Sequence, residues 1–436
     1  MQVLAVSGLV VLTLLVYVIW ARVERRRHAA HQEIARDVAS LGDDLVPTSI
    51  HPLVDADVCM GSGACVAACP EDRVIGIVNG QAALINPLSC IGHGACMKAC
   101  PVHAISLVFG TATRAAVLPE LDARFQTSQP GVYVAGELGG MSLIRNAIEQ
   151  GKQVARAITA SRVRGERDTL DAIVVGAGPA GISATLQLLE DGLRVELLEE
   201  SAFGGTIRHY PRAKVTMTGV LDIPRYGKIK ARTMSKEQLL ALWEDIRVRA
   251  ALPVRTGERV EAIERDRGAW LVRSSSGQRR AANVVLALGR RGAPRRLGVP
   301  GEELAKVSYR LLEPAEFAGR HVLVVGGGNS AAESAIGLAE HGKCASVTLS
   351  YRRGELARVR ASVRTALELH VRAGRVQKLA PTEITAISAR SVRLVAPGGR
   401  AFAIANDAVI VQIGGSSPVE LLASFGVRTV EKRAQA

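Results

Sequence analysis

Six of the seven cysteines in this chain of 436 residues fall into two short segments that repeat one pattern. Residues 59–70 read C-M-G-S-G-A-C-V-A-A-C-P, and residues 90–101 read C-I-G-H-G-A-C-M-K-A-C-P, an offset of 31 positions. Glycine and alanine fill most of the places between the cysteines, so the backbone can curl tightly and several thiols can converge on one centre. This region is therefore expected to fold around thiolate ligands rather than around an apolar core alone.

The spacing resembles the C-x2-C-x2-C-x3-C-P motif of two-cluster bacterial ferredoxins, in which the fourth cysteine of each motif ligates the other motif's cluster. The resemblance covers residues 51–110, a small α+β domain in that family. It implies six iron ligands: Cys59, Cys65, Cys69, Cys90, Cys96 and Cys100.

One position in each motif departs from the family. Ser62 and His93 stand where the second cysteine is expected. If both are iron ligands, each cluster keeps four irons. If Ser62 is a turn residue and His93 a hydrogen-bonding neighbour, the resemblance implies clusters of three irons. Structural disulfides are not expected in the reducing compartment that the N-terminal segment indicates. A zinc site fits the Cys-Pro endings and the nested repeat poorly.

The chain begins with a run of eighteen apolar or small residues from Val3 to Trp20. Arg22, Arg25, Arg26, Arg27 and His28 follow it. The run is long enough to cross a bilayer as a helix, and positive charge after it favours an outside N-terminus. We expect a single-pass anchor in the inner (cytoplasmic) membrane, with all later domains in the cytoplasm. The alternatives are a cleaved signal peptide and a buried helix.

Farther along, a buried strand at residues 171–175 leads into the turn G-A-G-P-A-G at residues 176–181. A helical stretch follows, and the next strand ends at Glu199, 23 residues after the first glycine. This is the βαβ fingerprint of a dinucleotide site. Its glycines allow close approach of a pyrophosphate to a helix N-terminus, and its acid receives the ribose hydroxyls.

A second copy starts with the strand at residues 321–325 and the turn G-G-G-N-S-A at residues 326–331. Its next strand is followed by Tyr351, Arg352 and Arg353, with no acid at the ribose position. Arginines there suit a 2′-phosphate, so NADP is favoured over NAD. The alternative is two surface arginines in an arginine-rich chain.

Together these motifs resemble the two-dinucleotide-fold flavoproteins of the thioredoxin reductase-like group, whose relatives include ferredoxin–NADP reductases and bacillithiol-disulfide reductases. The resemblance implies an α/β chain with two Rossmann-like domains, FAD in the first and NAD(P)H in the second. The implied FAD contacts are Gly176, Gly178, Gly181, Glu199, Gly204, Gly205 and Thr206. The implied NADP(H) contacts are Gly326, Gly328, Ala331, Arg352 and Arg353.

The family's last FAD-binding segment, T-S-x-P-G-V-Y-x-A-G-D, is missing from the C-terminus. A close match, T-S-Q-P-G-V-Y-V-A-G-E, occurs at residues 127–137, upstream of the first glycine turn. We infer a circular permutation that adds Gly136 and Glu137 to the FAD contacts; an unrelated strand and helix is the alternative.

The expected order of parts follows from these motifs. It is an anchor over 1–21, a juxtamembrane helix and linker over 22–50, a ferredoxin domain over 51–110, the permuted FAD segment over 111–160, the FAD domain over 170–292, the NAD(P)H domain over 293–415 and a C-terminal tail over 416–436.

The route by which electrons leave is indicated by the thiols that are missing. Thioredoxin reductases use a Cys-x-x-Cys pair, and bacillithiol-reductase relatives carry a cysteine where this chain has Ala180. After residue 110 the only cysteine is Cys344. Disulfide exchange is therefore not expected, and single electrons would leave through iron–sulfur clusters.

We expect a path from NADPH through FAD and the clusters to a single-electron-transfer protein or a membrane redox partner. The alternatives are the reverse reaction, with a ferredoxin-like donor and NADP as acceptor, and a redox-sensing subunit without turnover. No acid–base residue is needed, and Arg208, His209 and Tyr210 lie near the flavin by sequence position alone. Relatives are commonly dimers, so a homodimer is also expected.

Nucleic-acid binding is not expected, because aromatics make up only 3% of the chain and no helix-turn-helix or zinc-finger pattern occurs.

Overall fold

A computed structural model forms the basis of this description. It divides the chain into two compact units, residues 1–115 with 433–436, and residues 116–432. The structure describes residues 2–40, 50–71, 73–111, 115–139, 143–161, 163, 166, 168–210, 215–217, 219–231, 233–289, 294–311, 313–356, 358–359, 361–415 and 418–433. It describes the backbone alone for 2–11, 37–40, 88, 209, 215, 217 and 361–362.

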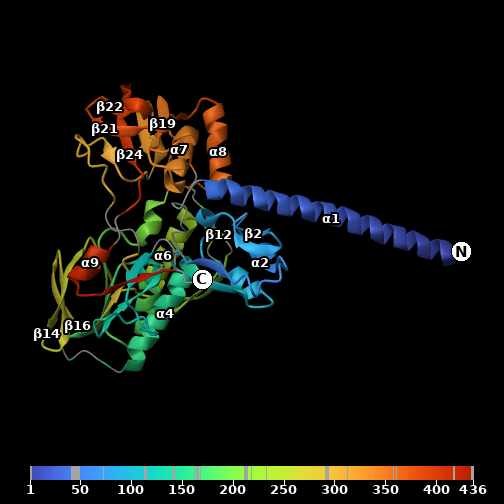
Figure 1. The fold of residues 1–436 in the computed structure, drawn as a ribbon. Helices are drawn as coiled ribbons and strands as arrows, with labels where there is room; N and C mark the ends of the chain where they lie inside the picture. The colour runs from blue at the N-terminus through green and yellow to red at the C-terminus, as the bar shows by residue number, and fades with distance from the viewer. Residues whose placement is uncertain are drawn as a thin grey trace. The chain divides into compact units, whose positions relative to one another are not determined.

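The first unit begins with a single helix of 39 residues, α1 (Gln2–Ser40), drawn in blue in Figure 1. The apolar run and the basic segment after it therefore belong to one continuous helix. The side chains of residues 3–11, half of the expected anchor, lie outside the described part. Among the described residues, no helix combines the length and apolar character that crossing a membrane requires.

The second half of α1 is fixed to the strand β2 (Ile75–Val78) by His31. Its Nδ1 accepts a hydrogen bond from the Ile77 N–H at 3.2 Å. A Cβ added at Gly76 would lie 2.8 Å from the His31 ring, so only glycine leaves room for it. Burial, and then the nearby His28, lowers the pKa of His31 and keeps the ring a neutral acceptor. This part of the expected linker is thus a docked helix.

The rest of the first unit is a small α+β domain with two antiparallel strand pairs, β1 with β4 and β2 with β3. Its helices α2 and α3 each follow a glycine with positive φ, and each carries one buried cysteine. The remaining elements are β1 (His51–Val54), α2 (Ala64–Ala68), β3 (Gln81–Leu84), η1 (Pro87–Ser89), α3 (Ala95–Ala99) and β4 (Ile105–Val108). The core packs Ile75, Ile77 and Ile105 against the sulfur-bearing loops.

The two largest sheets described in the second unit each follow one glycine turn; the first is mixed, with β14 and β15 antiparallel, and the second is parallel. The first has seven strands in the order β13-β8-β7-β16-β15-β14, with β6 also paired to β16. Its strands are β6 (Val132–Val134), β7 (Leu170–Val175), β8 (Val195–Glu199), β13 (Val254–Thr256), β14 (Val260–Asp266), β15 (Ala269–Ser274) and β16 (Gly277–Leu286). β7 is buried along almost its whole length, as expected for a parallel strand covered on both faces.

The segment around residues 127–161 joins this first sheet although it precedes β7 in the chain. β6 pairs parallel to β16, with Val132 opposite Val284 and Val134 opposite Leu286. The helix α4 (Ile144–Ser161) then packs along α5 (Pro179–Glu190). The backbones approach so closely that a Cβ at Gly151 would lie 2.3 Å from the Ala180 carbonyl oxygen.

The C-terminal residues also join this half of the unit. β25 (Thr429–Lys432) pairs antiparallel to β5 (Ala116–Pro119). The short helix α9 (Val419–Ser424), red in Figure 1, buries Leu422 in the core of the first sheet. The expected tail is therefore a structured part of the fold over its described residues.

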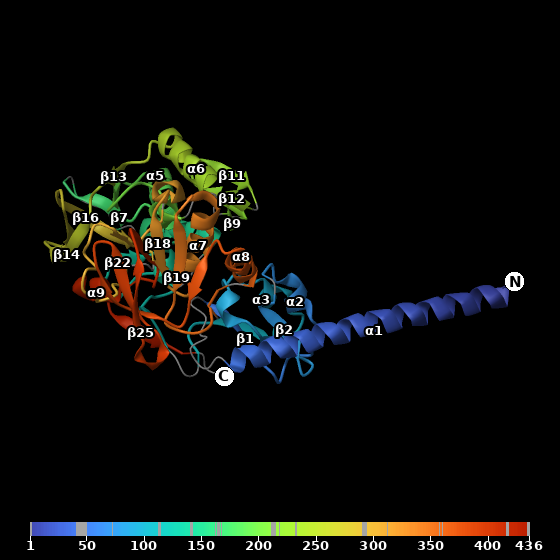
Figure 2. The ribbon, with the colours of Figure 1, turned by 90° about the horizontal axis from the view of Figure 1, so that it is seen from above.

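The second sheet has the order β17-β24-β18-β19-β20, and every pairing in it is parallel. Helices α7 and α8 pack together beside it (Figure 2). Its elements are β17 (Val307–Ser308), η4 (Pro314–Phe317), β18 (His321–Val325), α7 (Asn329–His341), β19 (Ser346–Ser350), α8 (Ala361–Arg372), β20 (Gln377–Leu379) and β24 (Ala408–Val411). A three-stranded meander accompanies it, with β21 (Glu383–Ile387), β22 (Ser391–Val395), η5 (Pro397–Gly399) and β23 (Ala401–Ala405).

Further elements accompany the sheet of the first fold, one in the segment before β7 and the rest between β8 and β13. Figure 2 shows β9, β11 and β12 beside α6. The elements are η2 (Gly136–Gly139), η3 (Gly205–His209), β9 (Val215–Met217), β10 (Val220–Ile223), β11 (Gly227–Lys230), β12 (Thr233–Ser235) and α6 (Lys236–Arg249). A capping box at Ser235 begins α6.

The contact between α4 and α5 yields a stability prediction. Gly151→Ala places a methyl group against the α5 backbone, which cannot retreat as a side chain would. We expect the free energy of unfolding of this unit to fall by about 1–3 kcal/mol, measured by chemical denaturation. Gly337→Ala in α7 is the control, because an added Cβ there meets nothing closer than 3.8 Å. Equal stabilities for the two variants would contradict the close packing of α4 on α5.

Candidate functional site

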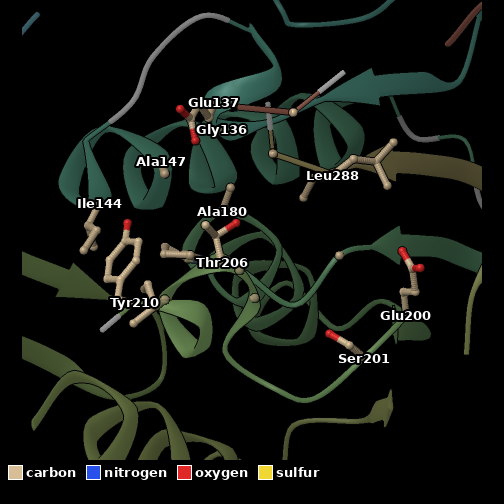
Figure 3. Close-up of a pocket in the computed structure, with 18 of the residues that line it drawn as sticks. Gly136, Glu137, Ile144, Ala147, Ala180, Glu200, Ser201, Thr206, Tyr210 and Leu288 are labelled. Atoms are coloured by element: carbon tan, nitrogen blue, oxygen red, sulfur yellow. The ribbon is translucent and has the colours of Figure 1, made fainter. Parts of the chain in front are cut away.

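A cavity of about 350 Å³ lies where the carboxyl ends of parallel strands from both sheets meet. Residues that directly follow β7, β8, β16 and β24 all line it, as expected for a ligand site in an open α/β sheet. Its walls include Gly136, Glu137, Ile144, Gly176, Gly178, Glu199, Gly205, Thr206, Tyr210, Ala287, Tyr309, Arg310, Gln412 and Gly414. Figure 3 shows the part formed by the first fold.

The first glycine turn is shaped by contacts that only glycine allows. Gly176 has φ of 103°, and a Cβ on it would lie 2.5 Å from the Ala287 carbonyl oxygen. A Cβ on Gly181 would lie 1.9 Å from the Gly176 carbonyl oxygen, so this glycine sets the packing of α5 on the turn and does not line the cavity. The contact at Gly176 agrees with the tight turn that the motif implies, whereas Gly181, an expected FAD contact, packs the helix against the turn instead.

Gly178 is the glycine that faces open space. No atom lies within 4 Å of the Cβ position there, and the residue is the N-cap of α5 without a side-chain cap. The first amides of α5 are therefore presented to the cavity, where an anionic group can accept from them. This cradle fits the pyrophosphate of a dinucleotide.

Glu199 is buried, with 7% of its surface exposed, and its carboxylate is held from both sides. One oxygen accepts from the Ala177 N–H at 2.8 Å, and the other accepts from the N–H and hydroxyl of Ser201 at 2.9 and 3.1 Å. A carboxylate has about four acceptor positions, so it can still accept from ribose hydroxyls. Glu200 and Ser201 lie at the same end of the cavity (Figure 3).

The opposite end is lined by Thr206, Ile144 and Tyr210 (Figure 3). The turn that leads to Thr206 packs against the first glycine turn, since a Cβ at Gly205 would lie 3.0 Å from the Cα of Gly178. Gly204 is buried in this turn and does not line the cavity. Lys236 fixes the Tyr210 backbone by donating from Nζ to its carbonyl oxygen at 2.6 Å.

Of Arg208, His209 and Tyr210, which were expected near the flavin from sequence position alone, the structure places only Tyr210 on the cavity wall among the described side chains. Tyr210 lines the cavity. Arg208 is exposed, its Nε donates to the Phe203 carbonyl oxygen at 3.1 Å, and it is not part of the lining. The side chain of His209 lies outside the described part.

Gly136 and Glu137 close the cavity from the displaced segment (Figure 3). Gly136 has φ of 82°, and its N–H donates to the buried Oε1 of Gln150 at 2.8 Å. Gln150, which the motif search did not single out, therefore ties this turn to α4. Its only sequence signal is a polar residue on the apolar face of a helix.

The second glycine turn repeats the same construction. Gly326 has φ of 147°, and a Cβ there would lie 2.3 Å from the Gln412 carbonyl oxygen. Gly328 is the N-cap of α7, without a side-chain cap and with open space in front of it. Ala331 is fully buried beneath the turn, where it replaces the third glycine. This cradle fits a second dinucleotide.

Two residues near this turn were missed by the motif search. The ring of Tyr351 lies so close to Gly327 that a Cβ there would come within 2.2 Å of it. The backbone of Arg358 forms a bridge with Gly328. Arg352 and Arg353 are exposed just after β19. Arg352, Arg353 and Arg358 thus lie within eight positions after this strand, and the sequence prediction included only the first two.

The predicted iron ligands gather around two small cavities in the first unit. Cys59, Cys65 and Cys100 line one, together with Ser62. Cys69, Cys90 and Cys96 line the other, together with His93. The last cysteine of each motif therefore faces the cavity of the other motif, which is the crossed arrangement that the resemblance implies.

Most of these thiols are held in apolar surroundings. Burial raises the pKa of Cys65, Cys69, Cys90 and Cys96, so iron must displace a proton from each to bind the thiolate. Backbone amides approach the two remaining sulfurs. Ala82 N–H donates to Cys59 at 3.4 Å and Ala104 N–H donates to Cys100 at 3.2 Å.

Ser62 and His93 differ in their surroundings. Ser62 is exposed, whereas the His93 ring is half-buried with Nε2 3.6 Å from the Cys69 sulfur. Within the described residues, no three His, Cys, Asp or Glu side chains lie close enough to share one metal ion. An iron–sulfur cluster sets a different requirement, because each cysteine binds its own iron.

Comparison with known proteins identifies both parts of the chain. Residues 51–101 match the 4Fe-4S dicluster domain, and residues 173–436, more than half of the chain, match the pyridine nucleotide-disulphide oxidoreductases. The chain belongs to the pyridine nucleotide-disulphide oxidoreductase family.

Its relatives include proteins named ferredoxin–NADP reductase. The one from Ignicoccus hospitalis is 32% identical over 264 residues, which cover 59% of this chain and 81% of that protein. The one from Thermus thermophilus is 34% identical over 226 residues, 50% of this chain and 63% of that protein. Among solved structures, the bacillithiol disulfide reductase of Bacillus cereus is similar, with a TM-score of 0.54 and 28% identity over 60% of this chain and 82% of that one.

The cavities and the family together establish the class of enzyme. This family member is an FAD-dependent NAD(P)H oxidoreductase with an iron–sulfur domain, and its cofactors are FAD, NADP(H) and iron–sulfur clusters. The open helix N-termini behind Gly178 and Gly328 fit two dinucleotides, and the crossed thiols fit two clusters.

The two open glycines provide a matched test of the cofactor cradles. Gly178→Val puts a side chain into the space before α5, so the purified variant is expected to retain little flavin. Gly328→Val makes the same change before α7, and should retain flavin but lose NADPH binding. Flavin absorbance and NADPH titration measure the two effects, and circular dichroism checks folding. A folded Gly178→Val variant with full flavin content would contradict this placement.

Proposed function

We propose that this protein is a membrane-anchored oxidoreductase that passes electrons from NADPH via FAD and its iron–sulfur clusters to a protein or membrane acceptor. The observation that carries this proposal is a flavin-type cavity without a thiol pair, in a chain that brings its own cluster domain. Cys344 is the only cysteine outside the cluster motifs. It does not line the cavity, and burial raises its pKa, which keeps it a thiol.

The contribution of the chain's own residues is to hold the two nucleotides in position. Gly178 and the amides of α5 would hold the FAD pyrophosphate, and Glu199 the ribose. Thr206 and Tyr210 of the first fold share one cavity with Tyr309 and other residues of the second fold, so both nucleotides have access to it. Bound flavin can accept a hydride and release electrons singly, which suits clusters that accept one at a time. No side chain has to act as an acid or base.

The clusters differ in their access to a partner. Met60 and Val58 flank Cys59 and are 67% and 45% exposed. At the second motif, the neighbour Ser89 is buried and Gly92 lies against the Ile50 backbone. We infer that the acceptor approaches the first cluster, where an apolar surface surrounds a ligand sulfur.

We infer that residues 111–160 are the family's terminal FAD-binding segment, moved in front of the FAD domain. The parallel pairing of β6 with β16 supports this, because it adds the segment to the FAD-domain sheet. The position of Gly136 and Glu137 on the cavity wall supports it too. Residues 160–169 would then be the new connection.

The anchor is proposed for the apolar run from Val3 to Trp20, with the catalytic domains in the cytoplasm. From residue 12 to residue 20 the described side chains of α1 are exposed, and they include eight large apolar ones. A helix that is apolar on every side needs an apolar environment, and the described part of the chain leaves these side chains exposed. The basic residues after Trp20 would lie at the inner surface of the membrane.

The reverse reaction is the second candidate, because the relatives described above are named ferredoxin–NADP reductases. In that direction a low-potential donor would reduce the clusters, and NADP would be the final acceptor.

A variant without clusters tests the proposed path. Cys65→Ser with Cys96→Ser removes one ligand from each cavity, and NADPH-driven reduction of cytochrome c is expected to fall at least about tenfold. Anaerobic reduction of the flavin by NADPH should keep its rate, which shows that the larger unit is intact. Undiminished cytochrome c reduction would mean that the flavin passes electrons directly. No turnover in the wild type would favour a redox-sensing subunit.

The coenzyme preference can be tested separately. Arg352→Ala with Arg353→Ala removes charges suited to a 2′-phosphate, so KM for NADPH is expected to rise about tenfold or more while KM for NADH changes little. Arg393→Ala, an exposed arginine on β22, is the control. An equal rise for both coenzymes, or none, would refute the assignment of these two arginines.

A further inference from the structure

We propose that His93 is a hydrogen-bond donor to the Cys69 thiolate and not an iron ligand, so that three cysteines hold the second cluster and His93 raises its reduction potential. The inference needs only the clusters and is independent of the direction of electron flow. It concerns three cysteines around one cavity, Cys69, Cys90 and Cys96.

The His93 ring carries its proton on the nitrogen that faces Cys69. His93 Nδ1 accepts a hydrogen bond from the Ala95 N–H at 3.0 Å. A neutral imidazole has one donor and one acceptor nitrogen, so Nε2 carries the proton. Nε2 is also the atom that faces Cys69, at 3.6 Å from its sulfur. An N–H group cannot ligate iron, but it can donate to a thiolate.

The distance between His93 Nε2 and the Cys69 sulfur is short for two ligands of one cluster. Two protein ligands of one iron–sulfur cluster bind different irons, with the sulfides between them, so their donor atoms lie well beyond hydrogen-bond range. His93 Nε2 and the Cys69 sulfur are within the range of an N–H···S hydrogen bond. Their separation fits a donor and acceptor rather than two ligands of one cluster.

The loop of residues 92–94, which carries His93, is held in place. Gly92 and Gly94, on either side of His93, both have positive φ. A Cβ at Gly92 would lie 2.5 Å from the Ile50 carbonyl oxygen, so the backbone is pressed against the chain before β1. With the ring also anchored through Nδ1, Nε2 cannot move to a new position without breaking the Ala95 hydrogen bond.

Among the described residues, no side chain of the first motif matches His93 as a hydrogen-bond donor to a ligand sulfur. Ser62 occupies the same place in its motif, but its side chain is exposed. Hydrogen bonds to ligand sulfurs stabilise the extra negative charge of a reduced cluster and so raise its potential. Backbone amides donate to Cys59 and Cys100 at the first cavity, so both clusters have such hydrogen bonds. The side-chain donor His93 adds a further contribution at the second cluster only.

The most direct test is pulsed EPR of the full-length protein labelled with 15N-histidine, with the redox state set by chemical mediators and without NADPH. We expect the weak nitrogen coupling of a hydrogen-bonded ring and the oxidised-state signal of a three-iron cluster. A strong coupling, typical of nitrogen bound to iron, would overturn the proposal. Neither result depends on turnover with NADPH, so failure of this proposal would not be failure of the proposed function.

Variants give a second readout. His93→Ala should retain the second cluster but lower its midpoint potential, and His93→Gln, which can place an N–H group near the Nε2 position, should restore much of that potential. His93→Cys should convert it to a four-iron cluster. Ser62→Ala, the matched change in the first motif, should leave the potential of the second cluster unchanged. Loss of the second cluster in both His93→Ala and His93→Gln, with its retention in His93→Cys, would show that His93 is a ligand.

Discussion

Backbone contacts that only glycine permits set the geometry of the flavin half of this enzyme. Gly176 lies against the Ala287 carbonyl and Gly181 against the Gly176 carbonyl, which joins the end of β16, the glycine turn and α5. Gly136 and Gly151 bring the displaced segment onto α5 at Ala180. A side chain at any of these glycines would separate elements whose ends form the cavity. The helix N-terminus faces the cavity because these contacts fix it there.

Ala180 links this packing to the chemistry. A Cβ on Gly136 would lie 2.9 Å from the Ala180 methyl group, so glycine at position 136 lets the displaced segment pack on Ala180, which also lines the cavity. The bacillithiol-reductase relatives are expected to carry a redox cysteine at this position, and here the residue is alanine. Without a thiol beside the cavity, the electrons need another exit. In the proposed path, the cluster domain of the same chain would provide one, without a separate carrier having to bind first.

Much of the fold and of the two candidate sites could be predicted from the sequence. Close backbone approach and metal ligation both require particular residue types at fixed spacing. The strands and turns of both nucleotide folds lie where the glycine motifs placed them, and Cys69 and Cys100 line the cavities that the ferredoxin motif implies. Contacts between distant positions could not be predicted. His31 is held by Gly76 and Ile77, and β25 pairs with β5 from the far end of the chain. The proton position on His93 depends on one amide of its own loop, which no motif encodes.

The central claim is that electrons pass from NADPH through the flavin to the clusters. The most direct measurement is an anaerobic titration of the detergent-solubilised protein with NADPH, in which flavin absorbance and the cluster EPR signals are followed together. The account predicts that the flavin bleaches and the cluster signals change to those of the reduced state in the same titration. A bleached flavin beside clusters that stay oxidised would contradict it, because the clusters would then lie below NADPH in potential and the reverse reaction would be favoured.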